Sequence, residues 1–301
     1  MKIMVADEFL ERGFPKSPVL KHLGLSRSSY YYVSTGTTAG KRPMQFVYDQ
    51  DHQCHDLSFV VDQIKELLEG EFVDYGYYKT YRHLNDELGL KIGSYRTYNL
   101  MKKNNLLNFQ RNKKKRTNRN WVKDLVPVVE TEFSFLEFDI KYVYIQGTKT
   151  NAQVLTVLDV FSRWNLGQYI AMSIKSEDVV RLFEEIFQRY PMPKQFIVRN
   201  DNGSQFEASL VQEYLREKGV TQEFTKPATP QQNAHIESYH SIMESAVCQR
   251  FEFENIADFR ETMTRWKKFY NFKRIHGGLG FKPPKKFLEA LGVEIGSKWD
   301  N

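Results

Sequence analysis

The order of strand-like and helix-like segments after residue 130 limits the possible fold of this chain more than any other feature. Segments rich in β-branched and aromatic residues predict strands, and they cover residues 133–144, 154–160, 166–171, 195–199 and 221–225. Segments with apolar residues at helical spacing predict helices, and they cover residues 176–190, 210–218 and 232–251. This order predicts an α/β domain with one mixed sheet, which we place at residues 126–250.

Three strands followed by helix, strand, helix, strand and helix is also the element order of the ribonuclease-H-like fold. We therefore predict that fold for the central domain. Residues 251–301 are expected to form a helical C-terminal extension.

Residues 1–36 are predicted to form a small helical domain. A short helix from Pro18 is ended by Gly24, and Ser26 can cap the helix that follows. Helix, glycine-containing turn and helix is the outline of a helix-turn-helix.

A second helical domain is predicted over residues 53–110. An apolar stripe over 57–68 indicates one helix, and two more are expected over 77–88 and from Ser94 onward. Two interpretations stay open: another helix-turn-helix with a basic recognition helix, or a three-helix bundle with a basic surface.

The charge of the chain points to a polyanionic partner. The formal net charge is +6 and the sequence pI is about 9.0, a basic balance that suits nucleic acid. No acid occurs from Lys102 to Arg119, where the basic residues are Lys102, Lys103, Arg111, Lys113, Lys114, Lys115, Arg116 and Arg119. This stretch, with Arg96 before it, is either a phosphate-binding segment or, over residues 111–125, a solvated linker.

Several protein classes are disfavoured by composition. Two cysteines, Cys54 and Cys248, do not make a disulfide framework, so a reducing cytosol is the expected compartment. The N-terminus has acids where a signal peptide would be apolar. No apolar run reaches the roughly 18 residues of a membrane span, so no membrane partner is expected.

Three acids in the central domain are candidates for catalysis. Asp139 lies inside an apolar strand, Asp201 directly follows a strand in an Asp-Asn-Gly turn, and Glu237 lies on the last helix. An acid in an apolar strand is costly unless something compensates it. Phosphoryl transfer on DNA can use two divalent metals about 3.5–4 Å apart, and hard Mg²⁺ prefers carboxylate oxygens.

Each acid also has an ordinary explanation. Asp201 suits any tight turn, and Glu237 alone would be read as an exposed helix residue. Asp159, a rival acid in the next strand, could brace the turn at Ser162 and Arg163. The case for catalysis therefore rests on the three contexts taken together.

Nearly the whole chain resembles a known family, the OrfB-type transposases of bacterial insertion sequences, within the DDE integrase-core superfamily that includes retroviral integrases. The resemblance is carried by ordered blocks, namely Phe138-Asp-Ile-Lys-Tyr142, Leu158-Asp-Val-Phe-Ser-Arg163, Asn200-Asp-Asn-Gly-Ser-Gln-Phe206, Gln232-Asn-Ala-His-Ile-Glu-Ser238, Tyr270-Asn-Phe-Lys-Arg-Ile-His276 and Leu279-Gly-Phe-Lys-Pro283. Two N-terminal segments, Leu25–Tyr31 and Tyr75–Lys79, resemble that family's helix-turn-helix regions.

The resemblance implies that Asp139, Asp201 and Glu237 are the catalytic triad and bind two Mg²⁺ or Mn²⁺ ions. It implies cleavage at the ends of an element and attack by the resulting 3′-hydroxyls on target DNA, with no covalent protein–DNA intermediate. The expected partners are double-stranded DNA, further copies of the chain on paired ends, and a first-frame transposase product. The expected location is the bacterial cytoplasm, at the nucleoid when the chain is bound to DNA.

The chain departs from the family pattern at two positions. Glu244 stands where the family often has a lysine seven residues after the catalytic Glu, and an extra acid near a phosphate path is unfavourable. Leu136 replaces a common tryptophan, which we interpret as a packing change. Candidate DNA contacts near the active site are Asn233, His240, Arg274 and His276. For Arg274 and His276 the alternative is a structural plug against the core.

Two rival functions are kept beside the transposase. Glu244 motivates a catalytically inactive, transposase-derived DNA-binding protein. The other is a ribonuclease-H-like nuclease that only hydrolyses, which would form no strand-transfer products.

Overall fold

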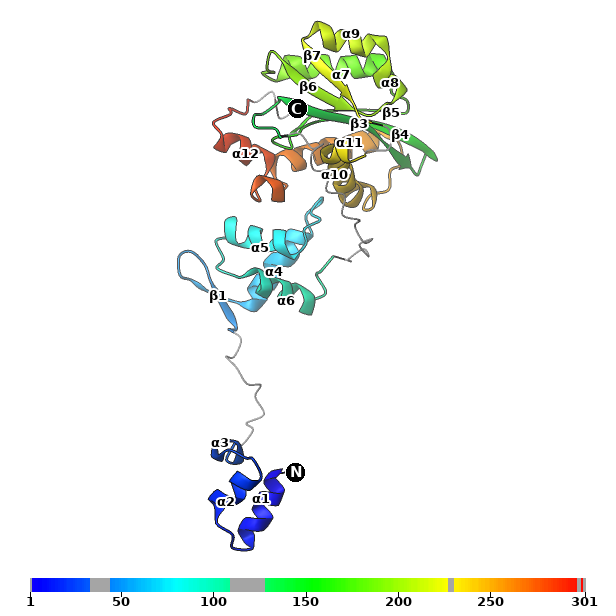
Figure 1. Cartoon of the computed structure of the whole chain (residues 1–301). Helices are drawn as coiled ribbons and strands as arrows, with labels where there is room; N and C mark the ends of the chain where they lie inside the picture. Colours follow the sequence, from blue (N-terminus) through cyan, green and yellow to red (C-terminus); the bar gives the residue numbers. More distant parts are fainter. Residues whose placement is uncertain (1, 33–43, 109–127, 227–229, 297–298, 300–301) are drawn as a thin grey trace. The chain divides into compact units, whose positions relative to one another are not determined.

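The computed structural model describes residues 2–32, 44–108, 128–226, 230–296 and 299 (Figure 1). They form two compact units, Met1–Gln45 and Phe46–Asn301. The predicted break at 36–43 and the predicted basic linker at 111–125, with Arg111, Lys113, Lys114, Lys115 and Arg116, lie outside the described residues.

The first unit contains α1 (Lys2–Glu11), α2 (Lys16–His22) and α3 (Arg27–Tyr30). Ser26 caps α3 as predicted, since its hydroxyl accepts a hydrogen bond from the backbone N of Ser29 at 3.0 Å. Helix α1 was not predicted. It buries Ala6 alone, so its sequence has little apolar periodicity.

The second unit begins with a short antiparallel hairpin, β1 (Phe46–Tyr48) and β2 (Cys54–Asp56). Strands of three residues are too short to show an alternating pattern, and this hairpin was not predicted. Three helices follow, α4 (Leu57–Leu68), α5 (Tyr77–Asp86) and α6 (Ser94–Lys103). They lie where helices were predicted, and they enclose a small core of their own.

The mixed sheet has five strands: β3 (Phe135–Ile145), β4 (Thr150–Asp159), β5 (Asn165–Ala171), β6 (Phe196–Asn200) and β7 (Val220–Phe224). Their order is β5-β4-β3-β6-β7. Strands β3, β4 and β5 form the antiparallel meander, whereas β6 and β7 run parallel to β3. This is the ribonuclease-H-like topology, as predicted.

Helices cover both faces of the sheet (Figure 1). On one face, α7 (Ser176–Arg189), the short α8 (Ser204–Glu207) and α9 (Ser209–Glu217) enclose a core with Phe138, Phe183 and Phe206. On the other face, α10 (Ala234–Met243) and α11 (Ile256–Phe272) enclose a second core with Tyr239 and Trp266.

The single helix predicted over 232–251 is wrong in its extent. A 3₁₀ turn at Pro230–Asn233 precedes α10, and a π-helical turn, Glu244–Cys248, follows it. The wider π turn lets two successive residues, Ala246 and Val247, both enter the core with no exposed surface.

The C-terminal residues complete the two cores of the sheet domain. Helix α12 (Pro284–Ala290) contributes Leu288 to the core under α7, and Trp299 joins the same core. Helix α11 contributes Trp266 and Tyr270 to the other core. In the part of the chain that the structure describes, no helix is long and apolar enough to cross a membrane.

Candidate catalytic site

Strand pairing brings two of the predicted catalytic acids to the same level of the sheet. Strand β6 runs parallel to β3, with Arg199 opposite Glu137. Because the two strands run in the same direction, the residues two positions further on, Asp139 and Asp201, meet at the end of β6. The register of one parallel pair therefore gathers acids that lie far apart in the sequence.

Asp201 opens the turn after β6. Its Oδ1 accepts a hydrogen bond from the backbone N of Gly203 at 3.1 Å. A Cβ at position 203 would stand 3.1 Å from that same Oδ1, so glycine leaves room for the carboxylate. Asn200 holds the turn from inside, because its Oδ1 accepts a hydrogen bond from Gln222 Nε2 at 2.9 Å. The hydrogen bonds of this turn are those of an ordinary Asp-Asn-Gly turn, and its Asp201 is exposed.

Glu237 lies in the first turn of α10 and is exposed. Partial burial raises its pKa, and the charges of Asp139 and then Glu137 raise it further. Partial burial also raises the pKa of Asp201, followed by the charge of Asp139. Asp139 therefore acts on both other acids, since nearby like charges disfavour ionisation. The structure brings the three predicted residues within one local electrostatic field.

The chemistry of these three donors fits a hard divalent cation, because all are carboxylates. Among the residues that the structure describes, no three His, Cys, Asp or Glu side chains stand close enough to hold a metal ion as they are placed. Repulsion between like charges opposes their closer approach in the absence of a cation.

Two predicted DNA contacts on α10 and at its start are buried. His240 is 8% exposed, and its Nδ1 lies 3.5 Å from Asp139 Oδ2. Asn233 is 6% exposed. Their polar atoms Nε2 and Oδ1 have no hydrogen-bond partner among the described residues. Of these two described side chains, only His240 contacts one of the carboxylates, that of Asp139.

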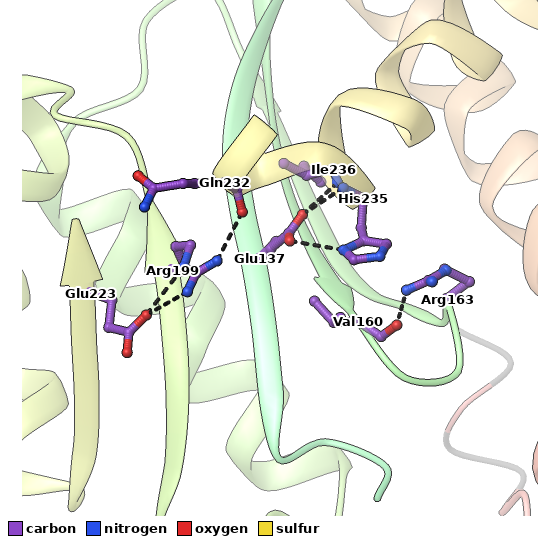
Figure 2. Close-up of polar contacts among 8 residues, drawn as sticks. All are labelled: Glu137, Val160, Arg163, Arg199, Glu223, Gln232, His235 and Ile236. Atoms are coloured by element: carbon purple, nitrogen blue, oxygen red, sulfur yellow. Dashed lines mark hydrogen bonds and ion pairs between the residues drawn. The ribbon is translucent and has the colours of Figure 1, made fainter. Parts of the chain in front are cut away.

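Glu137, which sequence reasoning missed, ties β3 to α10 (Figure 2). Its Oε2 accepts hydrogen bonds from the backbone N of His235 at 2.9 Å and of Ile236 at 2.7 Å. Its Oε1 lies 3.0 Å from Nδ1 of the His235 ring. The only sequence signal is a second acid in an apolar strand, two residues before Asp139.

Arg199 holds the segment that leads into α10 (Figure 2). Its Nε and Nη2 donate to Glu223 Oε2 at 3.1 and 2.9 Å, and its Nη1 donates to the carbonyl O of Gln232 at 3.0 Å. Strand β6, strand β7 and the start of α10 are joined by this one guanidinium.

Glu244 does not stand alone beside the site. The Nζ of Lys141 lies 3.0 Å from its Oε2. Lys141 is two residues after Asp139 in β3 and therefore projects from the same face of the strand. The acid that replaces the usual lysine is thus paired with a lysine from the neighbouring strand.

Asp159, the rival acid, braces the turn as one interpretation predicted. Its Oδ2 accepts a hydrogen bond from the backbone N of Ser162 at 2.8 Å, and its Oδ1 accepts one from the backbone N of Phe133 at 3.1 Å. Complete burial raises its pKa to about 6. This carboxylate is enclosed and has no access to a substrate.

The structure places Arg274 and His276 in the interior, at 2% and 8% exposure. Arg274 forms a bidentate pair with Asp74 in the loop between α4 and α5. Burial lowers the pKa of His276 well below its usual value, followed by the charge of Arg274. Arg274 therefore joins the loop between α4 and α5 to the core, and His276 packs against Tyr270 within the core.

The remaining described candidates lie on α6. Lys102 and Lys103 are exposed, and Arg96 is partly exposed, with Nη2 donating to the carbonyl O of Phe46 at 3.1 Å. Tyr95 on the same helix is 77% exposed. Helix α6 therefore exposes an aromatic ring near its start and two lysines at its end.

The sheet carries Asp139 inside β3 and Asp201 directly after β6, and Glu237 lies on the adjacent helix α10. Residues 130–230 match the integrase core domain family, and residues 218–284 match a second family of the same description. The two matches together span residues 130–284, and they place this part of the chain among the integrase core domains of the polynucleotidyl transferase superfamily. Residues 56–114 match the HTH-like domain family, which decides in favour of the helix-turn-helix interpretation.

The chain is similar to several insertion-sequence proteins. It is 31% identical over 156 residues to the transposase for insertion sequence element IS904 of Lactococcus lactis, covering 50% of this chain and 58% of that protein. An uncharacterized protein of insertion element IS476 of Xanthomonas euvesicatoria is 30% identical over 135 residues, or 44% of this chain and 38% of that protein. The chain therefore spans about half the length of these curated relatives.

A more distant relative matches over most of its length. The putative transposase InsK for insertion sequence element IS150 of Escherichia coli is 22% identical over 272 residues, or 88% of this chain and 90% of that protein. Among solved structures, the HTLV-2 integrase catalytic core domain in complex with magnesium is 12% identical, with a TM-score of 0.40 over 52% of this chain and 95% of that chain.

Proposed function

We propose that the chain is a DNA transposase that cleaves at the ends of an insertion sequence and joins the 3′-hydroxyls to target DNA. Asp139, Asp201 and Glu237 are its catalytic acids. The observation that carries this proposal is the parallel register of β3 and β6, which gathers Asp139 and Asp201 next to α10. The similarity to insertion-sequence transposases supports the substrate, DNA.

The three carboxylates would hold two Mg²⁺ or Mn²⁺ ions. When bound, such ions stabilise the attacking and leaving oxygens of an in-line displacement. The chain's own residues supply the placement: Asp139 from a rigid central strand, Asp201 from the turn that Asn200 holds, and Glu237 from α10. The Nδ1 of His240 lies 3.5 Å from Oδ2 of Asp139, so this ring can help to orient the carboxylate.

DNA binding is proposed for the HTH-like domain, through Arg96, Lys102 and Lys103 on α6. Exposed cations on one helix suit phosphate contacts and groove binding. We propose that Arg274 and His276 act on the fold instead, because both are buried. The chain is proposed to act in the bacterial cytoplasm as an oligomer on paired ends, alone or with a first-frame product.

The test is end cleavage and joining on a labelled DNA that carries the ends of the element. Wild type is compared with Asp201→Asn, each with Mg²⁺ and with EDTA. Metal-dependent nicked and joined products, lost in the variant, are the expected result. Nicking without joined products would favour the hydrolytic nuclease. Specific binding with no chemistry in wild type, even with a first-frame product added, would favour the DNA-binding derivative.

A further inference from the structure

Glu137 is a fully buried acid near the site. Its side chain is 0% exposed, and it accepts two backbone hydrogen bonds and one contact from an imidazole. Burying a carboxylate is costly unless it is fully hydrogen-bonded. Because burial of this carboxylate costs free energy, its hydrogen bonds must provide a function that an apolar residue at this position of β3 could not provide.

The bonds of Glu137 are made to the first turn of α10. The first backbone N–H groups of a helix have no partner within the helix, and the positive end of its dipole favours an anion. The N-cap residue of α10, Asn233, makes no side-chain capping bond. Glu137 thus caps this helix from the neighbouring strand.

The position of this cap relates directly to the proposed catalytic acids. Glu137 is two residues before Asp139 on the same face of β3, and His235 is two residues before Glu237. Arg199, two residues before Asp201, holds the carbonyl O of Gln232 just ahead of the helix. Figure 2 shows both tethers at the start of α10.

We propose that Glu137 is a positioning residue, whose bonds to the first turn of α10 set the separation between Asp139 and Glu237 and so the geometry in which a divalent cation binds. The inference rests on the proposed function, since it assumes that those acids bind a cation. In this proposal, Glu137 acts through the length of its side chain, which lets it bond to α10, and not through its negative charge.

Two substitutions separate reach from charge. Glu137→Gln keeps the length: its amide O can accept both backbone bonds, and its NH₂ can donate to His235 Nδ1 when that ring carries its proton on Nε2. Glu137→Asp keeps the charge but is one methylene shorter, so it cannot reach the helix without moving it. Tyr190→Phe is the control, because it removes buried bonds to Leu166 and Trp164 under the opposite face of the sheet.

The experiment measures Mn²⁺ binding to the full chain at pH 8, from the electron paramagnetic resonance signal of free Mn²⁺, with the folded fraction checked by circular dichroism. We expect Glu137→Gln to bind within about twofold of wild type and Glu137→Asp to bind at least about tenfold more weakly, the usual loss when a residue that orients ligands is changed. Tyr190→Phe should bind as wild type while unfolding at a lower temperature.

Weak binding by the Gln variant with normal binding by the Asp variant would overturn the proposal in favour of a role for charge. Normal binding by both would also overturn it. If the Asp variant does not fold, His235→Ala replaces it: loss of one contact should weaken binding about threefold, and unchanged binding would overturn the proposal. Absent Mn²⁺ binding in wild type, or equal binding in Asp139→Asn, would instead refute the metal site of the proposed function.

Discussion

Glu137 and Asp139 are two acids on one face of one strand, and the structure gives them opposite surroundings. Glu137 is fully buried and has three partners on α10. The Asp139 side chain is 25% exposed. Among the described residues, its Oδ1 accepts a hydrogen bond from the adjacent backbone N of Ile140 at 2.8 Å, and its Oδ2 lies 3.5 Å from Nδ1 of His240. The comparison teaches that the donors around a carboxylate decide its role: a saturated carboxylate holds the fold, and an unsaturated one is available to a cation.

Amide substitution at these two positions should give the largest contrast. Asp139→Asn is expected to lower end cleavage and joining by at least about a thousandfold, as loss of a catalytic group does. Glu137→Gln should change the same rates by less than about threefold, because its hydrogen bonds can be remade. Gel assays of cleavage and joining on labelled ends measure both. Equal losses at the two positions would break the comparison.

The same contrast is expected between buried and exposed cations. Arg274→Met leaves the partly buried Asp74 without its partner, so the free energy of unfolding should fall by about 3 kcal/mol, measured by urea denaturation. Affinity for end DNA per folded molecule should stay unchanged. Lys102→Ala with Lys103→Ala should do the reverse, lowering DNA affinity with little change in stability. Weaker DNA binding by folded Arg274→Met would show that this residue does contact DNA.

The exposed acids should make the metal-free protein less stable at neutral pH. The folded-state pKa values of Asp201 and Glu237 are raised above their ordinary values. A raised acid pKa means that the folded state binds protons more tightly than the unfolded state, so stability is lost as pH rises through the folded-state pKa. Mg²⁺ binding should have the opposite pH dependence. It should weaken as pH falls, because Asp201 and Glu237 take up protons at a higher pH than ordinary carboxyls do.

Asp201→Asn tests whether the charge of Asp201 destabilises the metal-free protein at neutral pH. Without metal at pH 7.5, its Tm should exceed that of wild type, because the amide removes the repulsion between this side chain and Asp139. The difference should shrink toward pH 4, and added Mg²⁺ should raise the Tm of wild type alone. A variant that is less stable than wild type at pH 7.5 would contradict the prediction.

The smallest effect is expected at the Lys141–Glu244 pair. Glu244→Gln releases Lys141 from its partner, so DNA should bind about two- to fivefold more tightly. The dependence of the binding constant on salt concentration should also steepen, by the amount expected for about one further phosphate contact. Fluorescence anisotropy over a salt series measures both. Glu261→Gln is the matched control, because it removes the same charge from a surface pair with Arg265 on α11. Equal changes in the two variants would assign the effect to net charge.

Local patterns predicted most of the elements around the site. The five strands of the sheet and helices α4 to α7 and α9 were expected within a few residues of their positions, because each has a complete apolar face. The short hairpin β1–β2 and α1 have no such face and were missed. The π turn after α10 was also missed, because it depends on how Ala246 and Val247 meet the core and not on their own spacing.

The sequence by itself determined the order of the elements, the fold class and the identity of Asp139, Asp201 and Glu237 as candidate acids. The elements follow from periodicity, and the three acids follow from their contexts taken together and from the sequence blocks that resemble the transposase family. Only the tertiary structure decided which acids are enclosed. Glu137 and Asp159 are buried and hydrogen-bonded to backbone N–H groups, and Glu244 forms an ion pair with Lys141. It also placed Arg274 inside against Asp74. The reason is physical, since exposure and hydrogen-bond partners depend on residues that are distant in the chain and meet only when the sheet and helices pack.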